Sequence, residues 1–380
     1  MKFSIYGYEF TQLIKRISGV VPKKSSFPPL EFVRIIANEN TVEVQGTDSD
    51  ELGSIKVPAE VFESGETWVY LSDLKKLTTI MDDVIITAND GIMDIRSQKK
   101  SYELLCRDLH DAWTYNPKVE SGTLQCKIKE IDLINHLSVL DCMRADEYNF
   151  ALKDFYFDLP RKNIVAMNNH RIGVARLDCD IDEENANGMI IHGGVYAKLK
   201  SLAGKPRKDN YVDIFADEKF VLFRGEDYSL ISRLEDGQYF KYYDFLVNVM
   251  RNMDYCYSII PEEMQRISKE YAKIIGKEEN PMIICNENGN IATAIQTPEY
   301  RTSDIVESVK SMFGMEEEWY AGFNPHYIAD ACNMYKGHVE INGSYSNKKP
   351  ILFHGHLYDC LVLPVSIQEK DVEFVKKQVA

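Results

Sequence analysis

The sequence has no long apolar run. None of its 380 residues belongs to a stretch approaching the roughly 18 apolar residues that suggest a membrane-spanning helix. The first residues, MKFSIYGYEF, alternate in polarity and lack the continuous apolar core of a signal peptide. Hydrophobic residues make up 44% of the chain and charged residues 27%, a composition typical of folded globular proteins. We therefore expect a cytoplasmic protein with several hydrophobic cores, because the chain is too long for one ordinary core.

Paired cysteines are also missing. The eight cysteines are scattered singly and form neither a CxxC pair nor a metal-ligand spacing. In a chain without a secretion signal, such cysteines are expected to be reduced and mostly buried as small apolar side chains. The sequence therefore predicts no disulfide framework and no metal site. The cysteines are Cys106, Cys126, Cys142, Cys179, Cys256, Cys285, Cys332 and Cys360.

Common catalytic motifs are absent as well. The chain contains no GxxxxGK[ST], GxGxxG, HExxH or GxSxG, the motifs of phosphate loops, dinucleotide sites, zinc proteases and many hydrolases. His354 and His356 lie on one face of a predicted strand and could hold a metal if a third ligand were near. His170 follows two asparagines in a predicted turn and could act as a general base. Neither segment has an evident partner group, so we expect no catalytic residue, metal or cofactor.

Positive charge is scarce. The 44 Lys and Arg residues against 59 Asp and Glu give a formal net charge of -15. Such a chain can bind nucleic acid only if its cations gather on one surface, because phosphate contacts need Lys and Arg. Helices facing one way could form a basic lining that contacts phosphates without sequence preference; ordinary solvated helix surfaces are the alternative. The cations on predicted helices are Lys15, Arg16, Lys75, Lys76, Lys198, Lys200, Arg266, Lys269 and Lys273.

One order of elements occurs three times along the chain. A predicted helix is followed by strands joined by tight turns, and each third also begins with a helix that precedes hairpin strands. Period-2 alternation bounded by Gly, Asn and Asp indicates the strands. The repeats are far longer than the roughly 20 to 50 residues of a solenoid unit, so each is a whole domain. The predicted helices are 8–19, 69–81, 129–140, 193–204, 261–276 and 323–337.

The repeats predict an α+β fold of three tandem domains, each a duplicated unit of one helix and an antiparallel sheet. The strand pattern breaks at SGTLQ and at NVMRNMD. We therefore predict domains at residues 1–121, 122–247 and 248–367, followed by an extension at 368–380.

Several blocks of sequence carry a resemblance to a known family. They are MKFSI at the start, ISGVVPKKSSFPPLEFVRI (17–35), GTDSDELGSIKVPAEVF (46–62), VAMNNHRIGVARLD (165–178), SRLEDGQY (232–239) and LVLPVSI (361–367). In order and over residues 1–367, these blocks resemble the bacterial beta sliding clamp, the beta subunit of DNA polymerase III. The resemblance implies three DNA-clamp domains forming half of a closed ring.

The resemblance also implies a function. A head-to-tail homodimer would encircle duplex DNA, with helices inside and sheets outside, and would tether the replicative polymerase and other clamp-binding proteins. It would confer processivity and have no catalytic site of its own. Polymerase, clamp loader and repair proteins would insert a short peptide into a pocket between the second and third domains. The implied pocket residues are Leu152, Met167, Asn169, His170, Arg171, Ile172, Val247, Asn324, Tyr327, Leu361, Leu363, Pro364, Val365 and Ser366; plain strand core is the alternative for Leu361 and Leu363.

Two further groups of residues follow from the resemblance. Lys24 matches a basic loop position and Phe150 an aromatic one on the DNA side, with Arg144, Lys198 and Lys200 as companions. For the dimer interface, Tyr102 and Leu104 should meet Ile274 and Ile275 of the partner, although adjacent isoleucines near a helix end could equally belong to the core.

Some positions depart from the family pattern. Asn168 and Asn169 replace an acidic residue and a glycine before His-Arg, Val247 stands where proline is frequent, and Ser366 where arginine is frequent. The tail QEKDVEFVKKQVA extends beyond the usual end and is expected to form a short helix near the pocket. These departures favour, as an alternative, a divergent or mobile-element clamp with an altered partner set. An acidic scaffold that does not encircle DNA, and an enzyme using His170 or the His354/His356 pair, are the other classes.

Overall fold

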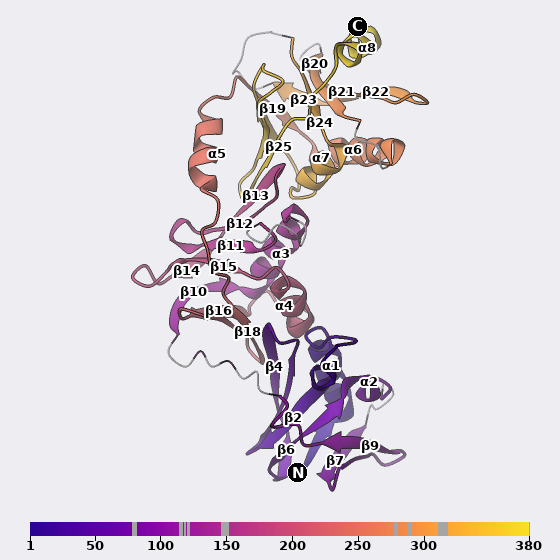
Figure 1. The fold of residues 1–380 in the computed structure, drawn as a ribbon, viewed down its shortest axis with the longest axis vertical. Helices are drawn as coiled ribbons and strands as arrows, with labels where there is room; N and C mark the ends of the chain where they lie inside the picture. The colour runs from indigo at the N-terminus through magenta and orange to yellow at the C-terminus, as the bar shows by residue number, and fades with distance from the viewer. Residues whose placement is uncertain are drawn as a thin grey trace. The chain divides into compact units, whose positions relative to one another are not determined.

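The structure is a computed structural model that divides into two compact units (Figure 1). Unit 1 comprises Met1–Asn135 with Asp178–Asp236, and unit 2 comprises His136–Leu177 with Gly237–Ala380. The described residues are 1–77, 82–113, 117, 119, 122–145, 152–276, 280–287, 290–310 and 318–379.

Unit 1 is built on one antiparallel sheet. Its strands are β1 (Lys2–Tyr6), β2 (Phe32–Asn38), β3 (Thr41–Thr47), β4 (Glu51–Pro58), β5 (Glu60–Glu63), β6 (Gly65–Tyr70), β7 (Asp83–Asn89), β8 (Ile92–Arg96), β9 (Ser101–Arg107), β10 (Thr123–Lys129), β14 (Cys179–Ile181), β16 (Tyr211–Ala216), β17 (Phe220–Arg224) and β18 (Tyr228–Arg233). They are hydrogen-bonded in the order β14-β10-β16-β17-β18-β4-β3-β2-β6-β9-β8-β7-β1-β5. A short strand, β15 (Gly188–Ile191), forms a bridge from Ile191 to Leu234.

Strand alternation and turn chemistry explain this sheet locally. In β7, Val84, Ile86 and Ala88 are buried while the residues at both ends are exposed. Asp90 and Gly91 join β7 to β8 with φ angles of 50° and 80°, the left-handed pair that a type I′ hairpin turn requires. This turn is one of the tight turns that the sequence predicts between successive strands.

The helices of unit 1 cover the sheet. They are α1 (Gly7–Ile17), α2 (Leu71–Leu74) and α4 (Val195–Ala203), with a 3-10 turn at Pro28–Glu31. α1 buries Phe10, Leu13, Ile14 and Ile17 at helical spacing. Just after α1, Gly19 lies close to α4: a Cβ atom there would be 2.2 Å from Oγ of Ser201. The helix predicted at 69–81 is shorter in the described residues: β6 continues to Tyr70 and α2 covers only Leu71–Leu74. Residues 78–81 lie outside the described residues.

Unit 2 contains two groups of strands. One has neighbours in the order β11 (Phe155–Asp158), β12 (Asn163–Met167), β13 (Arg171–Arg176), β27 (Tyr358–Val362), β26 (Ile351–His354), β25 (Val339–Gly343), β19 (Tyr255–Ile259) and β23 (Ser308–Lys310). The other is a four-stranded sheet in the order β22 (Arg301–Val306), β21 (Asn290–Gln296), β20 (Met282–Glu287) and β24 (Tyr320–Phe323).

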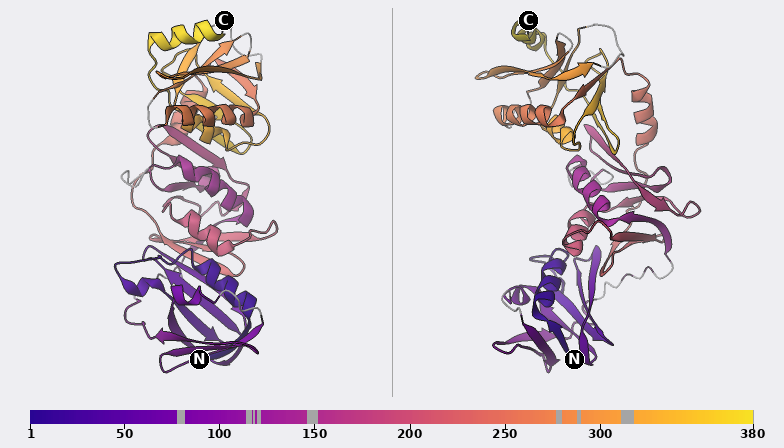
Figure 2. Two further views of the ribbon diagram at one scale, coloured as in Figure 1. Left: turned by 90° about the vertical axis from the view of Figure 1, so that its right-hand side faces the viewer. Right: turned by 180° about the vertical axis from the view of Figure 1, so that it is seen from behind.

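The helices of unit 2 are α5 (Tyr242–Met250), α6 (Pro261–Ile275), α7 (Pro325–Cys332) and α8 (Glu369–Val379), with 3-10 turns at Asp141–Met143 and Leu159–Arg161. α3 (Glu130–Leu140) begins in unit 1 and ends in unit 2. α6 starts at a proline in its first turn and ends at Gly276 with a φ of 58°, as helix-start and helix-stop rules expect. Figure 2 shows the four-stranded sheet between α6 and α8.

The α+β fold class predicted from the sequence is confirmed, and the predicted helices at 8–19, 129–140, 193–204 and 261–276 are present with small differences at their ends. The helix predicted at 323–337 is present but shorter, since α7 ends at Cys332. α5 was not predicted: it runs without interruption through NVM, where the sequence indicated a break. Among the described residues, no helix combines the length and apolarity that a bilayer span needs. The three-domain boundaries stay a prediction.

Candidate partner-binding and DNA-binding sites

The candidate peptide pocket depends on a strand pair in unit 2. β13 and β27 are antiparallel, with Arg171 opposite Val362 and Ile172 opposite Leu361. Directly after β27, the Leu363 N–H donates to the His170 carbonyl oxygen at 2.8 Å. Two segments far apart in the sequence are therefore held side by side.

An apolar cluster forms at this strand pair. Five of the predicted pocket residues belong to it: Leu152, Met167, Ile172, Leu361 and Leu363. Leu361 and Ile172 are buried, whereas Leu152 and Leu363 are only partly buried. The partly buried side chains are the ones that an entering peptide could contact.

Residues that sequence reasoning missed also contribute to the apolar cluster. They are Val165, Val174, Tyr242, Leu246 and Leu352, with Tyr156, Tyr239, Phe245, Val249 and Met253 packed against them. The rings of Tyr156 and Tyr239 stack with centroids 4.8 Å apart. The only available signal was the helical spacing of 242, 246, 249 and 253, which the apparent break at NVMRNMD obscured.

Val247 was predicted in the pocket wall but is not among the side chains of the apolar cluster. On α5, Tyr242, Phe245, Leu246 and Val249 share one face at helical spacing, and Val247 lies off that face. α5 therefore presents Phe245 and Val249 to the cluster in its place.

A polar border adjoins the apolar cluster. The side chain of Asn168 accepts the N–H groups of His170 and Arg171 at 2.9 and 3.0 Å, which shapes the turn between β12 and β13. The His170 ring stacks on Tyr327 with centroids 5.7 Å apart, and the Arg171 guanidinium lies 4.4 Å from the same ring centroid. Tyr327 is thus oriented by His170 and Arg171, and His170 is exposed.

Arg171 itself is a buried support. Its side chain is 7% exposed and donates to Asp330 at 2.5 Å and to the carbonyl oxygen of Cys142. Asn324 precedes α7 and caps it by accepting the N–H of His326 at 2.9 Å. Both predicted pocket residues therefore fix the position of Tyr327 and of α7.

The C-terminal wall of the pocket consists of Leu363, Pro364, Val365 and Ser366. The Val365 N–H donates to the Gly322 carbonyl oxygen at 2.8 Å. Leu363, Pro364 and Val365 are half-buried, and Ser366 is exposed. Asn169 is also exposed, in the turn that bears His170.

The predicted DNA-binding cations differ in their availability. Lys24 and Lys200 are exposed. Arg144 is only partly exposed, and its guanidinium bonds to the Asp141 carboxylate and to the Lys153 carbonyl oxygen. Phe150 lies outside the described residues.

Lys198 is enclosed in a network of charged groups in unit 1. It is 8% exposed, and its ammonium contacts the carboxylates of Asp48 and Glu51. The His192 Nδ1 lies 2.7 Å from Oε1 of Glu51, which is fully buried. Burial raises the pKa of Asp48, but the charge and hydrogen bond of Lys198 together with backbone N–H groups outweigh it and leave the pKa below its usual value.

The geometry argues against the predicted DNA contact of Lys198. Two carboxylates of the same unit already neutralise the Lys198 charge. Little electrostatic attraction therefore remains for a DNA phosphate. The physical reason is burial between α4 and the start of β4, which the helical position of the lysine does not reveal.

Comparison with known proteins places these features in a family context. No protein-family model matches the chain. It is 21% identical over 378 residues to the beta sliding clamp of Bacillus subtilis, covering 91% of this chain and 93% of that protein. It is 26% identical over 258 residues to the beta sliding clamp of Staphylococcus aureus, covering 63% of this chain and 66% of that protein.

Solved structures agree over a greater length. A putative DNA polymerase III beta subunit from Eubacterium rectale superposes with a TM-score of 0.86 at 19% identity, covering 97% of this chain and 100% of that chain. The DNA polymerase sliding clamp of Bacillus subtilis has a TM-score of 0.83 at 20% identity with the same coverage. The chain has the fold of the beta sliding clamps. The resemblance seen in the sequence is thereby confirmed.

The predicted dimer residues of this clamp fold lie on β9 and α6. Tyr102 and Leu104 are half-buried on one face of β9, opposite Ile95 and Met93 of β8. Ile275 is buried within its own unit, whereas its neighbour Ile274 is half-buried. Ile275 therefore serves the core of its own chain, and Ile274 is the better exposed of the two.

His354 ends β26 and lies opposite Asp359 of the neighbouring strand β27. His356 lies in the turn between these strands, so the prediction that both histidines share one face of a strand is wrong. The His354 Nδ1 lies 2.6 Å from the Asp359 carboxylate. This hydrogen bond raises the pKa of His354, against the lowering effect of burial. Among the described residues, no group of three or more potential metal-binding side chains occurs.

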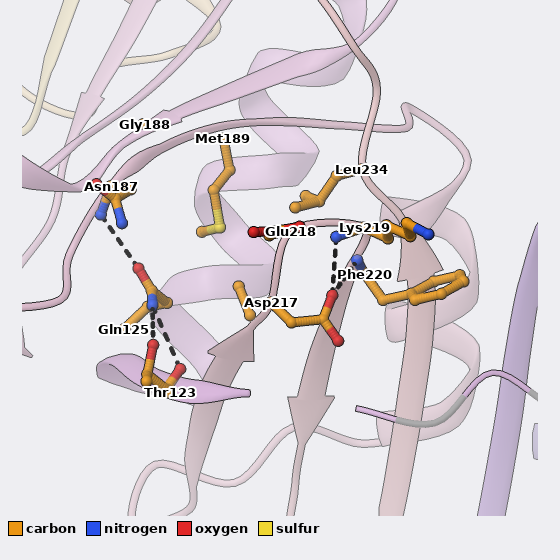
Figure 3. Close-up of a pocket in the computed structure, with 11 residues that line it drawn as sticks. Thr123, Gln125, Asn187, Gly188, Met189, Asp217, Glu218, Lys219, Phe220 and Leu234 are labelled. Carbon is orange, nitrogen blue, oxygen red and sulfur yellow. Dashed lines mark hydrogen bonds between the residues drawn. The ribbon is translucent and has the colours of Figure 1, made fainter. Parts of the chain in front are cut away.

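A polar cavity of about 730 Å³ opens in unit 1, near β10, β16 and β17 (Figure 3). Its polar groups bond to one another: the Asn187 N–H donates to Gln125, and Gln125 donates to Thr123. Asp217 accepts the N–H groups of Lys219 and Phe220 at 2.8 Å each. We assign no site to this cavity.

We predict that Lys198→Ala lowers the free energy of unfolding by about 3 to 5 kcal/mol, because removing one partner leaves buried carboxylates uncompensated. Lys200→Ala, on the same helix but exposed, should change it by less than about 0.5 kcal/mol. Urea unfolding followed by circular dichroism measures both. Equal stability of the two variants would show that the charged network does not stabilise unit 1.

Proposed function

We propose that the chain is a DNA sliding clamp. Two copies would join head to tail into a closed ring around duplex DNA and tether a replicative polymerase and other clamp-binding proteins, conferring processivity without a catalytic step of their own. The observation that carries this proposal is the likeness to sliding clamps over nearly the whole chain, in sequence and in fold.

Free strand edges support the head-to-tail assembly. β9 pairs with β8 along Ser101–Leu105, but among the described residues it pairs with β6 only at Cys106 and Arg107. β22 is an edge strand with Ile305 58% exposed. Unpaired edges with exposed apolar side chains favour strand addition. A contact between two different surfaces closes into a ring only if its rotation fits two copies.

The distribution of charge supports loose contact with DNA. Exposed lysines such as Lys24 and Lys200 lie on an acidic chain of net charge -15. Lysines contact phosphates without sequence preference and with strong salt dependence, and the net negative charge weakens the attraction. Weak contacts suit a ring that holds DNA by encircling it and must slide.

The apolar cluster with its polar border supports a peptide pocket. Partly buried Leu152, Phe245 and Leu363 can receive one or two apolar anchor residues, while His170 and Tyr327 provide polar and aromatic contacts. Such a mixture is typical of sites that bind short peptides. The aromatic side chains of α5 and the altered turn before His170 favour a partner set of this clamp's own.

We predict a solution mass of about twice 43.7 kDa that persists on dilution to nanomolar concentration. Light scattering followed by analytical ultracentrifugation measures it. Leu104→Asp should yield monomers, because a carboxylate would be desolvated at the interface, whereas Glu103→Gln on the same strand should remain dimeric. A wild-type monomer at all concentrations would remove the ring and favour an acidic protein-binding scaffold.

We also predict that duplex DNA binds weakly and independently of sequence. Lys24→Ala and Lys200→Ala should each lower the slope of log affinity against log salt by about 1, since each removes one phosphate contact. Lys219→Ala, at the exposed turn between β16 and β17, is the control and should leave the slope unchanged. Fluorescence anisotropy with two unrelated duplexes distinguishes these cases; equal effects of all three variants would contradict the assignment.

For the pocket, the probe is a fluorescein-labelled ten-residue peptide of Gly, Ser and Gln with one Leu-Phe pair. We predict that Leu363→Asp weakens its binding at least tenfold, because the carboxylate would face the apolar cluster. Leu357→Asp, at an exposed leucine in the turn before β27, should bind as the wild type does. Affinity unchanged by Leu363→Asp would remove the basis for this pocket.

A further inference from the structure

The four-stranded sheet of unit 2 is buried on both faces. Met282, Ile283, Ile284 and Cys285 are successive residues of β20, and none is more than 3% exposed. Side chains alternate between the two faces of a strand, so a continuous apolar run requires a covering layer on each side.

α6 provides the first layer. The Ser268 hydroxyl points at the sulfur of Met282, and the Tyr271 hydroxyl donates to the Asp304 carboxylate of β22 at 2.8 Å. Thr293 of β21 contacts the same tyrosine. Met282, Ile284 and Thr293 therefore belong to the α6 face.

α8 provides the second layer. Phe374 and Val375 pack in one cluster with Ile283, Cys285, Ala292 and Ala294 of β20 and β21. Val375 is fully buried and Phe374 is 8% exposed. The alanines and the cysteine are small, which lets the helix lie close to the strands, and both views in Figure 2 show α8 on the side of this sheet away from α6.

The same cluster reaches the pocket wall through Ile367, which packs against it. Ile367 lies over Gly322: a Cβ atom there would be 2.3 Å from Cγ2 of Ile367. The Gly322 carbonyl oxygen accepts the Val365 N–H at 2.8 Å. The hydrogen bond from the Leu363 N–H to the His170 carbonyl oxygen anchors the upstream end of the wall. The contacts of Val365 and Ile367 with Gly322 anchor its downstream end.

No flexible linker separates Ile367 from α8. The Gln368 N–H donates to the Asp371 carboxylate, and the Asp371 N–H donates to the Gln368 carbonyl oxygen, each at 3.0 Å. With this reciprocal pair of hydrogen bonds, α8 begins at Glu369, two residues after Ile367. Docking of α8 on the sheet therefore fixes the end of the wall directly.

We propose that α8 holds the segment Leu363–Ser366 in its binding conformation, with Phe374 and Val375 as positioning residues for the peptide pocket. This inference rests on the proposed pocket. A wall ordered before binding raises affinity because less conformational entropy is lost when the peptide enters. Release of α8 would remove the packing of Ile367 against the cluster and leave the downstream end of the wall held by the Val365–Gly322 hydrogen bond.

The first test needs no peptide. In the full-length chain, Phe374→Ser should speed amide hydrogen exchange of Leu363 and Val365 at least tenfold, while exchange in β25 and β26 stays slow and shows that the fold is retained. Glu373→Ser, an exposed neighbour on α8, should leave exchange unchanged. Val375→Ala, a milder change, should act in the same direction as Phe374→Ser. Unchanged exchange of residues 361–367 in both core variants would overturn the proposal.

The second test uses the Leu-Phe probe peptide. Phe374→Ser should bind it at least fivefold more weakly than the wild type and Glu373→Ser, with the solution mass unaltered. If the wild type binds the probe and Phe374→Ser binds it with equal affinity, the proposed role of α8 is overturned but the pocket is not. A wild-type chain that does not bind the probe would overturn the pocket itself, and the role of α8 in it; the solution mass tests the ring separately.

Discussion

Backbone hydrogen bonds between β13 and β27 hold the candidate pocket together, because they pair Ile172 with Leu361 and Arg171 with Val362. Side chains alternate along each strand, so a register shift of one residue would turn Ile172 or Leu361 away from the apolar cluster. The turn carrying His170 and the wall beginning at Leu363 are positioned by the same pairing. Other contacts secure the rest of the pocket: Tyr242 of α5 bonds to Asp158, and Val365 of the wall bonds to Gly322.

Charge has two separate uses in the chain. Arg171 and Lys198 are largely buried and bound to carboxylates, and Arg16 forms a two-bonded pair with Asp227 at 2.6 Å. These cations fix α7, α4 and α1 relative to neighbouring strands of their own units. The exposed lysines are left for phosphates, and the net negative charge of the chain limits how tightly DNA could be held. Loose contact is what the proposed sliding ring requires.

The local elements of the fold were predictable wherever periodicity was clear, as in α1 and α6 and in the Asp90–Gly91 turn. α5 was missed because the apparent break at NVMRNMD obscured the helical spacing of its apolar residues. Five residues of the apolar cluster were among the pocket residues implied by the family resemblance, whereas Phe245 and Tyr239 depend on packing that only the folded chain shows. Lys198 looked like a surface cation because the sequence cannot reveal that Asp48 and Glu51 meet it in space. The run MIIC in β20 was a readable signal for a second covering layer, and the tail supplied the helix that forms it.

The two sides of the pocket are fixed by different contacts. On one side, the Tyr242 hydroxyl donates to Asp158 at 2.7 Å and accepts from Asn163 at 3.1 Å, which secures the first turn of α5. On the other, Val365 and Ile367 secure the C-terminal wall, and α8 holds Ile367 against the sheet. Because these contacts share no residue, a change in α5 can alter which apolar side chain the pocket accepts without loosening the wall. A change in α8 should instead alter affinity for all peptides alike, since it acts on the order of the wall and not on its chemistry.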